Sequence, residues 1–222
     1  IPPLGTTLLI MIFLPTPQNI EKAASLLKTE ELVSFPTETV YGLGGLARSD
    51  KAVLKIYQTK GRPSCNPLIV HVESLDQAKA LGIFDETAER VASFFWPGPL
   101  TIVVPLRESS QISPFVTAGL KTVAIRFSRH PILLDLLRLV GEPLVAPSAN
   151  PSGFLTSSTA EHVHKAFPHL FVLEGGSCTE GVESTIVSLK EKNISILRPG
   201  ALSKEDIENK TNLAVAFVDK QE

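Results

Sequence analysis

The amino-acid sequence predicts an α/β protein built on a single twisted, mixed, open sheet with flanking helices. Two observations support this fold class. Short β-rich segments alternate with amphipathic helical segments through the middle of the chain, and two strands follow each other directly near its end. Alternation favours parallel strands joined by helices, whereas consecutive strands favour antiparallel pairs. No stretch rich in Gly, Ser or Pro divides the 222 residues, so we expect one domain.

In the first half of the chain, helix signals separate compact apolar runs. Thr16 followed by Pro17 is a typical helix start, and apolar residues at helical spacing continue to Lys28. Segment 36–45 follows a strand and ends in glycines, so we expect it to be a loop. The expected strands are 11–14, 32–35, 68–72 and 100–106, and the expected helices are 17–28, 49–60, 76–81 and 86–95.

The second half shows the same alternation until its last third. Pro131 at the start of an apolar helical pattern and Gly141 just beyond it are the asymmetry expected of a helix. The expected strands are 122–127, 144–146, 171–173, 185–189, 195–197 and 214–218, and the expected helices are 130–140, 159–167 and 204–209.

Composition excludes several classes of protein. Hydrophobic residues make up 43% of the chain, which is too many for a disordered protein. The 21 Lys and Arg against 23 Asp and Glu give a net charge of −2, so a general basic coat for nucleic acid is excluded. Two distant cysteines make neither a disulfide scaffold nor a four-cysteine zinc site, and they suit a reducing cytoplasm. The longest apolar run, 8–14, is too short to span a membrane.

Cations and neutral hydrogen-bonding groups gather in the segments between strands. Lys60 and Arg62 flank a glycine in a proline-stiffened loop, a pattern that suits phosphate, although both also complement the dipole at the end of the preceding helix. Arg126 ends an apolar strand and needs an anionic partner, either a structural carboxylate or a substrate. Ser148 and Asn150 follow a buried strand, where a plain turn is the alternative reading.

The motifs of several reaction classes are missing from the sequence. It contains no His-Glu-x-x-His or Cys-x-x-Cys metal spacing, no Gly-x-Gly-x-x-Gly helix start and no clear Ser/His/Asp set. Taken alone, His71 reads as a structural histidine, and segment 36–45 as a turn whose threonine hydroxyls bond the local backbone. The remaining inventory indicates an anionic ligand that is held and polarised with little proton transfer by the protein.

Seven segments together resemble the YrdC family of threonylcarbamoyl-AMP synthases. Each is weak alone, but they occur in the order of the family and cover about residues 12–201. The segments are 34–43, 60–63 with 66–68, 96–101, 123–126, 147–150, 184–187 and 197–200.

The resemblance implies a nucleotidyltransferase reaction and a shape. L-threonine, bicarbonate and ATP would give threonylcarbamoyl-AMP and pyrophosphate, with Mg²⁺ expected to assist and no protein metal ligands assigned. A partner transferase system would then modify an adenosine in tRNA, and a weak contact with tRNA itself is compatible with this role. The implied fold has a concave, positively charged cavity.

The resemblance also carries residue roles onto matching positions. The catalytic signature falls on Lys60, Arg62, Ser148 and Asn150. The ATP site would comprise these four together with Asn66, Thr122, Thr156 and Arg198. Threonine would be held by Thr37, Tyr41, His71, Arg126, the Ala146 backbone and Ser184.

The boundaries expected from the sequence follow from its single methionine and from the last family segment. Because Met11 is the only Met, we expect residues 1–10 to be a non-native or disordered leader. Residues 11–202 would form the catalytic domain, and 203–222 a C-terminal extension or the start of a linker. Longer members of the family carry a linker and a further C-terminal domain.

Two other functions remain open at this point. A nonenzymatic RNA-binding module would use a concave basic surface, although the net charge of −2 disfavours it. A carbamoyl-transfer module of hydrogenase maturation contains a related domain, but it also carries zinc-finger segments whose cysteine pairs are missing here.

Overall fold

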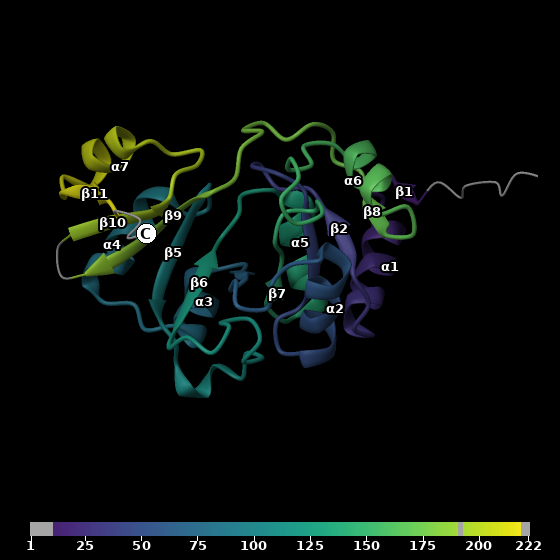
Figure 1. Ribbon diagram of the computed structural model, residues 1–222, viewed down its shortest axis with the longest axis horizontal. Coiled ribbons are helices and arrows are strands. Elements are labelled where there is room, and N and C mark those ends of the chain that lie inside the picture. The colour runs from purple at the N-terminus through teal and green to yellow at the C-terminus, as the bar shows by residue number, and fades with distance from the viewer. Residues whose placement is uncertain (1–10, 191–192, 219–222) are drawn as a thin grey trace, which may run out of the picture.

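The computed structural model describes residues 11–190 and 193–218 of the chain, and the leader expected at 1–10 lies outside these residues (Figure 1). The described strands form one sheet in the order β1-β8-β2-β3-β7-β4-β6-β5-β9-β10-β11. Their bounds are β1 Ile12–Phe13, β2 Val33–Phe35, β3 Gly42–Leu46, β4 Ile69–His71, β5 Leu100–Pro105, β6 Thr122–Arg126, β7 Leu144–Val145, β8 Phe171–Leu173, β9 Thr185–Lys190, β10 Asn193–Arg198 and β11 Val215–Phe217.

The described helices are those that the sequence predicts, with one short addition. Their bounds are α1 Pro17–Lys28, α2 Asp50–Lys60, α3 Leu75–Leu81, α4 Glu86–Phe95, α5 Pro131–Val140, α6 Ala160–Ala166 and α7 Lys204–Thr211, and the 3₁₀ turn η1 covers Glu108–Ser110. The capping signals behave as expected. Thr16 and Ser49 accept hydrogen bonds at the starts of α1 and α2, and Gly141 ends α5 with φ 74°.

The sheet mixes both strand directions, as predicted. β1, β8 and β2 run parallel to one another, as do β4 with β6, β5 with β9 and β10 with β11. The remaining neighbours pair antiparallel, including β7, which inserts between β3 and β4. The sheet remains open, with β1 and β11 at its two edges.

The prediction of a loop over residues 36–45 was wrong in its second half, because Gly42–Leu46 forms the buried strand β3. Its glycines have a packing role. A Cβ at Gly44 would lie 2.2 Å from Phe35 Cε1, and one at Gly42 would lie 3.2 Å from Phe35 Cε2. The phenyl ring therefore lies flat against the neighbouring strand, which only glycine permits. A strand with three glycines lacks the apolar alternation by which strands are recognised in a sequence.

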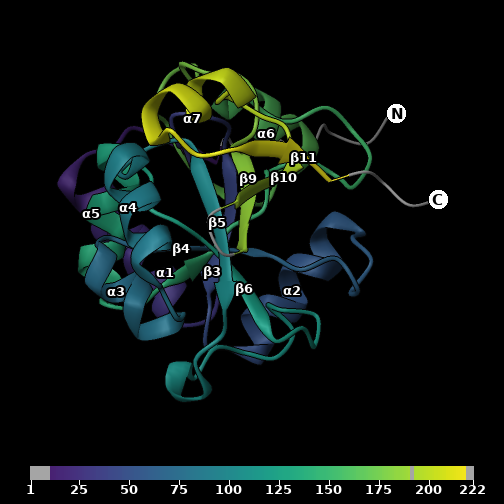
Figure 2. The same cartoon turned by 90° about the vertical axis from the view of Figure 1, so that its left-hand side faces the viewer.

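Helices cover the two faces of the sheet unequally. Figure 2 shows α1, α3, α4 and α5 on one side of the sheet and α2 on the other. Buried residues of α1 and α5 pack together against β2 and β8 in one core cluster, while α2, α3 and α4 contribute to a second, larger cluster. The face of β4, β6, β5 and β9 opposite α3 and α4 carries no helix (Figure 2). This open face is available to form a site.

Two further segments join the halves of the molecule and extend its sheet. The chain between β8 and β9 crosses over the top of the sheet in Figure 1, and Glu180 N donates to Glu38 O along the way. Beyond residue 203, α7 begins with a capping box at Ser203, and β11 adds a parallel strand beside β10. None of the helices described is long and apolar enough to cross a membrane.

Candidate active site

A row of residues in register across the open face forms the floor of a cavity. His71 of β4 lies opposite Arg126 of β6, which lies opposite Thr101 of β5. Thr101 in turn faces Ile186 of β9, and Ile186 faces Arg198 of β10. Residues directly opposite each other in a sheet share a face. Five strands therefore present one continuous row of side chains, and all but Thr101 line the cavity.

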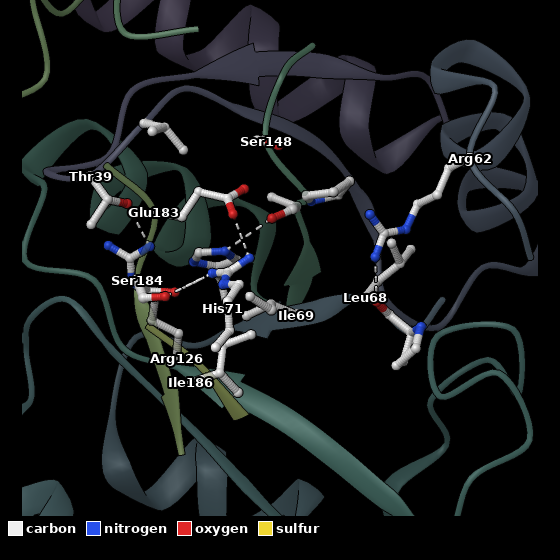
Figure 3. A pocket seen from close by; sticks show the side chains of 15 residues that line it. Thr39, Arg62, Leu68, Ile69, His71, Arg126, Ser148, Glu183, Ser184 and Ile186 are labelled. Atoms are coloured by element: carbon white, nitrogen blue, oxygen red, sulfur yellow. Dashed lines mark hydrogen bonds and ion pairs between the residues drawn. The ribbon is translucent and has the colours of Figure 1, made fainter. Parts of the chain in front are cut away.

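The walls of this cavity come from segments far apart in the sequence. About 520 Å³ of space free of protein atoms lies within it, including its open mouth. Figure 3 shows His71 at its centre, Arg62 at one end, and Arg126 with Thr39 at the other. The lining residues are Thr39, Val40, Arg62, Pro67, Leu68, Ile69, His71, Arg126, Ala146, Pro147, Ser148, Glu183, Ser184, Ile186 and Arg198. Three arginines against one carboxylate make the lining cationic.

Lys60 connects two of the predicted segments by hydrogen bonds behind the cavity wall. Its side chain is only 4% exposed, and its Nζ donates to the carbonyl oxygens of Ser148 and Asn150, at 2.5 Å each. Burial, and then the neighbouring Arg62 guanidinium, lowers the pKa of Lys60 to about 8. The expectation that the 60–62 and 148–150 segments meet is confirmed. The ammonium is bound to backbone carbonyls and does not line the cavity.

Arg62 does reach the cavity. Its Nη2 donates to Pro67 O at 2.9 Å and its Nε to Asn66 O at 3.2 Å, so the guanidinium is held by its own loop. Its remaining N–H groups have no hydrogen-bond partner among the described residues. Burial lowers the pKa of Arg62 from its usual value, and the guanidinium remains charged at neutral pH. The side chain is therefore a preformed donor for an anion.

The sequence left open whether the anionic partner of Arg126 is a structural carboxylate or a substrate. The structure supplies a structural carboxylate, Glu38. Arg126 Nη2 lies 2.7 Å from Glu38 Oε1, and both side chains are 4% exposed. Its Nη1 donates to Thr39 Oγ1 at 2.8 Å, and its Nε to Gly98 O at 3.4 Å. Burial tends to raise the pKa of Glu38, but Arg126 and the Ser128 hydroxyl outweigh it and hold that pKa below its usual value. Glu38 was missed as a site residue, although an arginine ending an apolar strand calls for such a partner.

His71 is a neutral acceptor on the cavity floor. Its Nε2 lies 3.3 Å from Ala146 O, and because a carbonyl only accepts, Nε2 carries the proton. Nδ1 then presents a bare lone pair with no partner among the described residues. Burial, and then Arg126, lowers the pKa of His71 to about 3.

The neutrality of His71 predicts a dependence of stability on pH. Its pKa falls from 6.5 in the unfolded chain to about 3 in the fold, so the unfolded chain binds the extra proton first. Lowering the pH from about 7 to about 4.5 should cost about 2–3 kcal/mol of unfolding free energy from this residue alone. Urea unfolding of wild type and His71→Gln at both pH values measures it. Equal losses in the two proteins would contradict the assignment.

Arg198 closes the other end of the row. Its Nη1 pairs with Glu183 at 2.7 Å, and its Nη2 donates to Ser184 O at 2.8 Å and to Ser184 Oγ at 3.1 Å. Ser184 Oγ also lies 2.8 Å from Thr101 Oγ1. Burial lowers the pKa of Arg198, while Glu183 opposes the shift. Glu183 lines the cavity and was not among the predicted site residues.

Gly200 permits the close approach that sets this geometry. A Cβ there would lie 2.3 Å from Glu183 O and 2.6 Å from Thr185 N, both backbone atoms that cannot turn aside. We expect Gly200→Ala to lower the unfolding free energy by about 1–3 kcal/mol and to weaken anion binding at Arg198. Urea unfolding and ATP titration measure these effects. Ser109→Ala, at an exposed position of η1, is the control, and equal behaviour of both variants would contradict the clash.

Several predicted residues do not line the cavity. The Thr37 hydroxyl bonds the backbone of Thr39 and Val40, as in the plain turn considered above. Tyr41 is buried, and its hydroxyl donates to Gly176 O at 2.9 Å. Asn150 is buried beside Lys60, with its Oδ1 unpaired among the described residues. Asn66 and Thr122 are exposed, and Thr156 is half-buried. Thr122 begins β6 and Arg126 ends it, so the two residues lie at opposite ends of the strand.

The position of the cavity differs from the simplest sequence argument. Ligands of parallel α/β sheets bind beyond the carboxyl ends of strands. In this mixed sheet, antiparallel neighbours such as β5 and β6 end at opposite edges, so the strand exits do not all meet at one edge. The cavity lies instead on the open face, across the strands. No group of three or more His, Cys, Asp or Glu suited to a metal ion occurs within residues 11–190 and 193–218.

The fold and site define a class: an α/β protein with a cationic cavity on the open face of a mixed sheet. The Sua5/YciO/YrdC family model, described as telomere recombination, matches residues 25–200. The chain belongs to this family, which confirms the resemblance and the fold class inferred from the sequence.

Curated relatives carry one name. The chain is 48% identical over 193 residues to threonylcarbamoyl-AMP synthase of Bacillus subtilis strain 168 and 45% identical over 193 residues to that of Pyrococcus abyssi. Each match covers 86% of this chain and 56% of the relative, so the chain spans about half the length of these proteins. A Klebsiella pneumoniae protein of the same name is 32% identical, with 72% of this chain and 85% of the relative covered.

Solved structures agree with the fold. P. abyssi Sua5 complexed with L-threonine matches with a TM-score of 0.85 and 40% identity, covering 92% of this chain and 61% of that one. Escherichia coli YciO matches with a TM-score of 0.78 at 19% identity, covering 88% and 97%. Full-length HypF matches with a TM-score of 0.72 at 18% identity, covering 82% and 24%. The last two likenesses concern the fold alone.

Proposed function

We propose that this chain forms threonylcarbamoyl-AMP and pyrophosphate from L-threonine, bicarbonate and ATP. The observation that carries the proposal is the convergence of Arg62, Arg126 and Arg198 on one cavity around a neutral His71. Three guanidinium groups suit the anionic groups of these substrates, which are the threonine carboxylate, bicarbonate and the triphosphate of ATP. The names of the relatives and the threonine complex of P. abyssi Sua5 support the same chemistry.

L-threonine would occupy the Arg126 end of the cavity. The free N–H groups of Arg126 would bind its carboxylate, and Ser184 Oγ lies 2.8 Å from Oγ1 of Thr101, the residue opposite Arg126. The Ala146 carbonyl, beside His71, is an acceptor, so it suits the donors of the amino acid, its amine and its hydroxyl. Thr37 and Tyr41 would act indirectly, by holding the turn and the crossing segment beside this end.

ATP would occupy the end formed by Arg62 and Ser148 and extend toward Arg198, which donates to Ser184 beside the threonine site. Arg62 offers an open fork for the phosphates, whereas Lys60 and Asn150 would shape the wall behind Ser148. Asn66, Thr122 and Thr156 remain candidates for its outer contacts. Mg²⁺ would enter bound to the triphosphate, because the one cavity carboxylate, Glu183, is already paired with Arg198. When bound, it would neutralise charge on the phosphates.

The reaction needs positioning more than proton transfer. The uncharged threonine amine combines with bicarbonate, by way of carbon dioxide, to give a carbamate, and one water molecule is released. A carbamate oxygen then attacks the α-phosphorus of ATP, and the bond to the β-phosphate oxygen breaks with its electron pair leaving on pyrophosphate. Negative charge develops on the phosphoryl oxygens, where Arg62 is held to receive it.

The product is an activated carbamoyl group, so a transferase must consume it. We propose a cytoplasmic tRNA-modifying threonylcarbamoyl transferase system as that partner, with at most a weak contact between this chain and tRNA.

The test is to incubate the chain with ATP, bicarbonate and each amino acid in turn. Mass spectrometry should find a carbamoyl-adenylate with threonine, together with threonine-dependent release of pyrophosphate. A pure RNA-binding module would release none. A carbamoyl-transfer module would act on carbamoyl phosphate in place of threonine and bicarbonate.

A further inference from the structure

Glu38 is the most deeply buried carboxylate at the site, and it is held by one ion pair and by hydrogen bonds to its second carboxylate oxygen and its backbone carbonyl. Its Oε1 pairs with Arg126 Nη2 at 2.7 Å, and its Oε2 accepts a hydrogen bond from the buried hydroxyl of Ser128. Ser128 in turn accepts from His130 N at the start of α5, at 3.3 Å. The Glu38 carbonyl accepts from Glu180 N and from Thr179 Oγ1 in the crossing segment. The residue thus links the cavity floor to two separate elements.

The pair has a different character from the other arginine–carboxylate pair of the cavity. Glu183 and Arg198 are about one-third exposed, and Glu183 lines the cavity. Glu38 is 4% exposed and does not line the cavity, although Arg126 does. Glu38 therefore holds Arg126 from behind, on the side away from the ligand space.

Arg126 needs such a support to present a defined edge. A guanidinium has five N–H donors, and Thr39 and Gly98 accept from two of them. The Glu38 carboxylate at Nη2 balances the buried charge, which would otherwise be costly. With the back of the guanidinium fixed, its remaining donors point in one orientation.

We infer that Glu38 is a positioning residue that aims the Arg126 guanidinium at the carboxylate of the amino-acid substrate. The inference rests on the proposed function, in which that carboxylate binds Arg126. The inference predicts different effects at the two ends of the cavity. Glu38 controls affinity for the amino acid at the Arg126 end, and it does not affect affinity for the nucleotide at the Arg62 end.

Calorimetric titration of the full chain with L-threonine and, separately, with ATP tests this separation. Glu38→Gln keeps the size of the side chain and removes its charge. We expect the dissociation constant for L-threonine to rise ~10- to 100-fold and that for ATP to change less than about twofold. In steady-state assays, KM for threonine should rise far more than kcat falls. Asp135→Asn, in the exposed pair with Arg138, is the matched control and should behave as wild type.

Ser128→Ala supplies a second test, which holds even where Glu38→Gln does not fold. It removes only the hydroxyl that holds Glu38, so threonine affinity should fall about 3- to 10-fold with ATP affinity kept. Unchanged threonine affinity in the folded variants would overturn the inference, and so would an equal loss of affinity for threonine and ATP. In either case, activity of the wild-type chain would still support the proposed function. A wild-type chain that neither binds threonine nor forms the carbamoyl-adenylate would overturn both.

Discussion

Arg62→Ala is expected to lower turnover ~100- to 1,000-fold while leaving the fold intact. Arg62 lines the cavity, and its bonds reach only the carbonyls of Asn66 and Pro67, two exposed residues of its own loop. Water can replace these bonds, so the free energy of unfolding should change by less than about 1 kcal/mol. The lost guanidinium leaves the charge of the transferring phosphoryl group without its fork of donors. Pyrophosphate release and urea unfolding measure the two effects.

Two comparisons sharpen this result. Arg62→Lys keeps a positive charge without a planar fork, so it should recover only part of the lost rate. Lys55→Ala removes a cation of α2, the helix that ends at Lys60 just before Arg62. Its partner is Glu31 at the surface, so this variant should leave turnover unchanged. Turnover near the wild-type level in Arg62→Ala would remove this residue from the mechanism.

Lys60→Ala is expected to damage stability and turnover together. The ammonium is buried and donates to Ser148 O and Asn150 O, so its removal leaves both carbonyls without their donor. We expect a loss of about 2–4 kcal/mol of unfolding free energy. The 148–150 segment would lose its anchor on α2, and a displacement of the cavity wall by about 1 Å typically costs ~100-fold in rate.

The contrast between the two cations is the informative measurement. Arg62→Ala should affect rate alone, whereas Lys60→Ala should affect both rate and unfolding. Lys55→Ala serves again as control, because its exposed ion pair contributes less than about 1 kcal/mol. A Lys60→Ala protein with wild-type stability and reduced turnover would show that Lys60 contacts the nucleotide directly.

Local signals explain how much of the fold was predictable. Caps at Thr16 and Ser49 and the Pro131 and Gly141 pair marked helices that the structure contains. The strand β3 was missed because its glycines make room for the ring of Phe35 on the neighbouring strand β2. This contact between strands cannot be recognised from the sequence of β3 alone. Packing between segments overrides local pattern in such a strand.

The site was predictable in its membership more than in its geometry. Arg62, His71, Arg126, Ser148, Ser184 and Arg198 were predicted, and all line the cavity. Strand register aligns His71, Arg126 and Arg198 in one row, and register is not written in the individual strands. Similarly, nothing in the Lys60–Arg62 segment indicates that one cation faces backbone carbonyls and the other faces the cavity.

The strand order has a consequence for synthesis of the protein. The cavity combines Thr39, near the beginning of the chain, with Arg198, in the tenth of its eleven strands. At ribosomal speeds, roughly ten seconds separate the emergence of these two positions. A nascent chain therefore exposes its arginines without the last wall of the cavity, and the cavity is complete only after β10 pairs with β9.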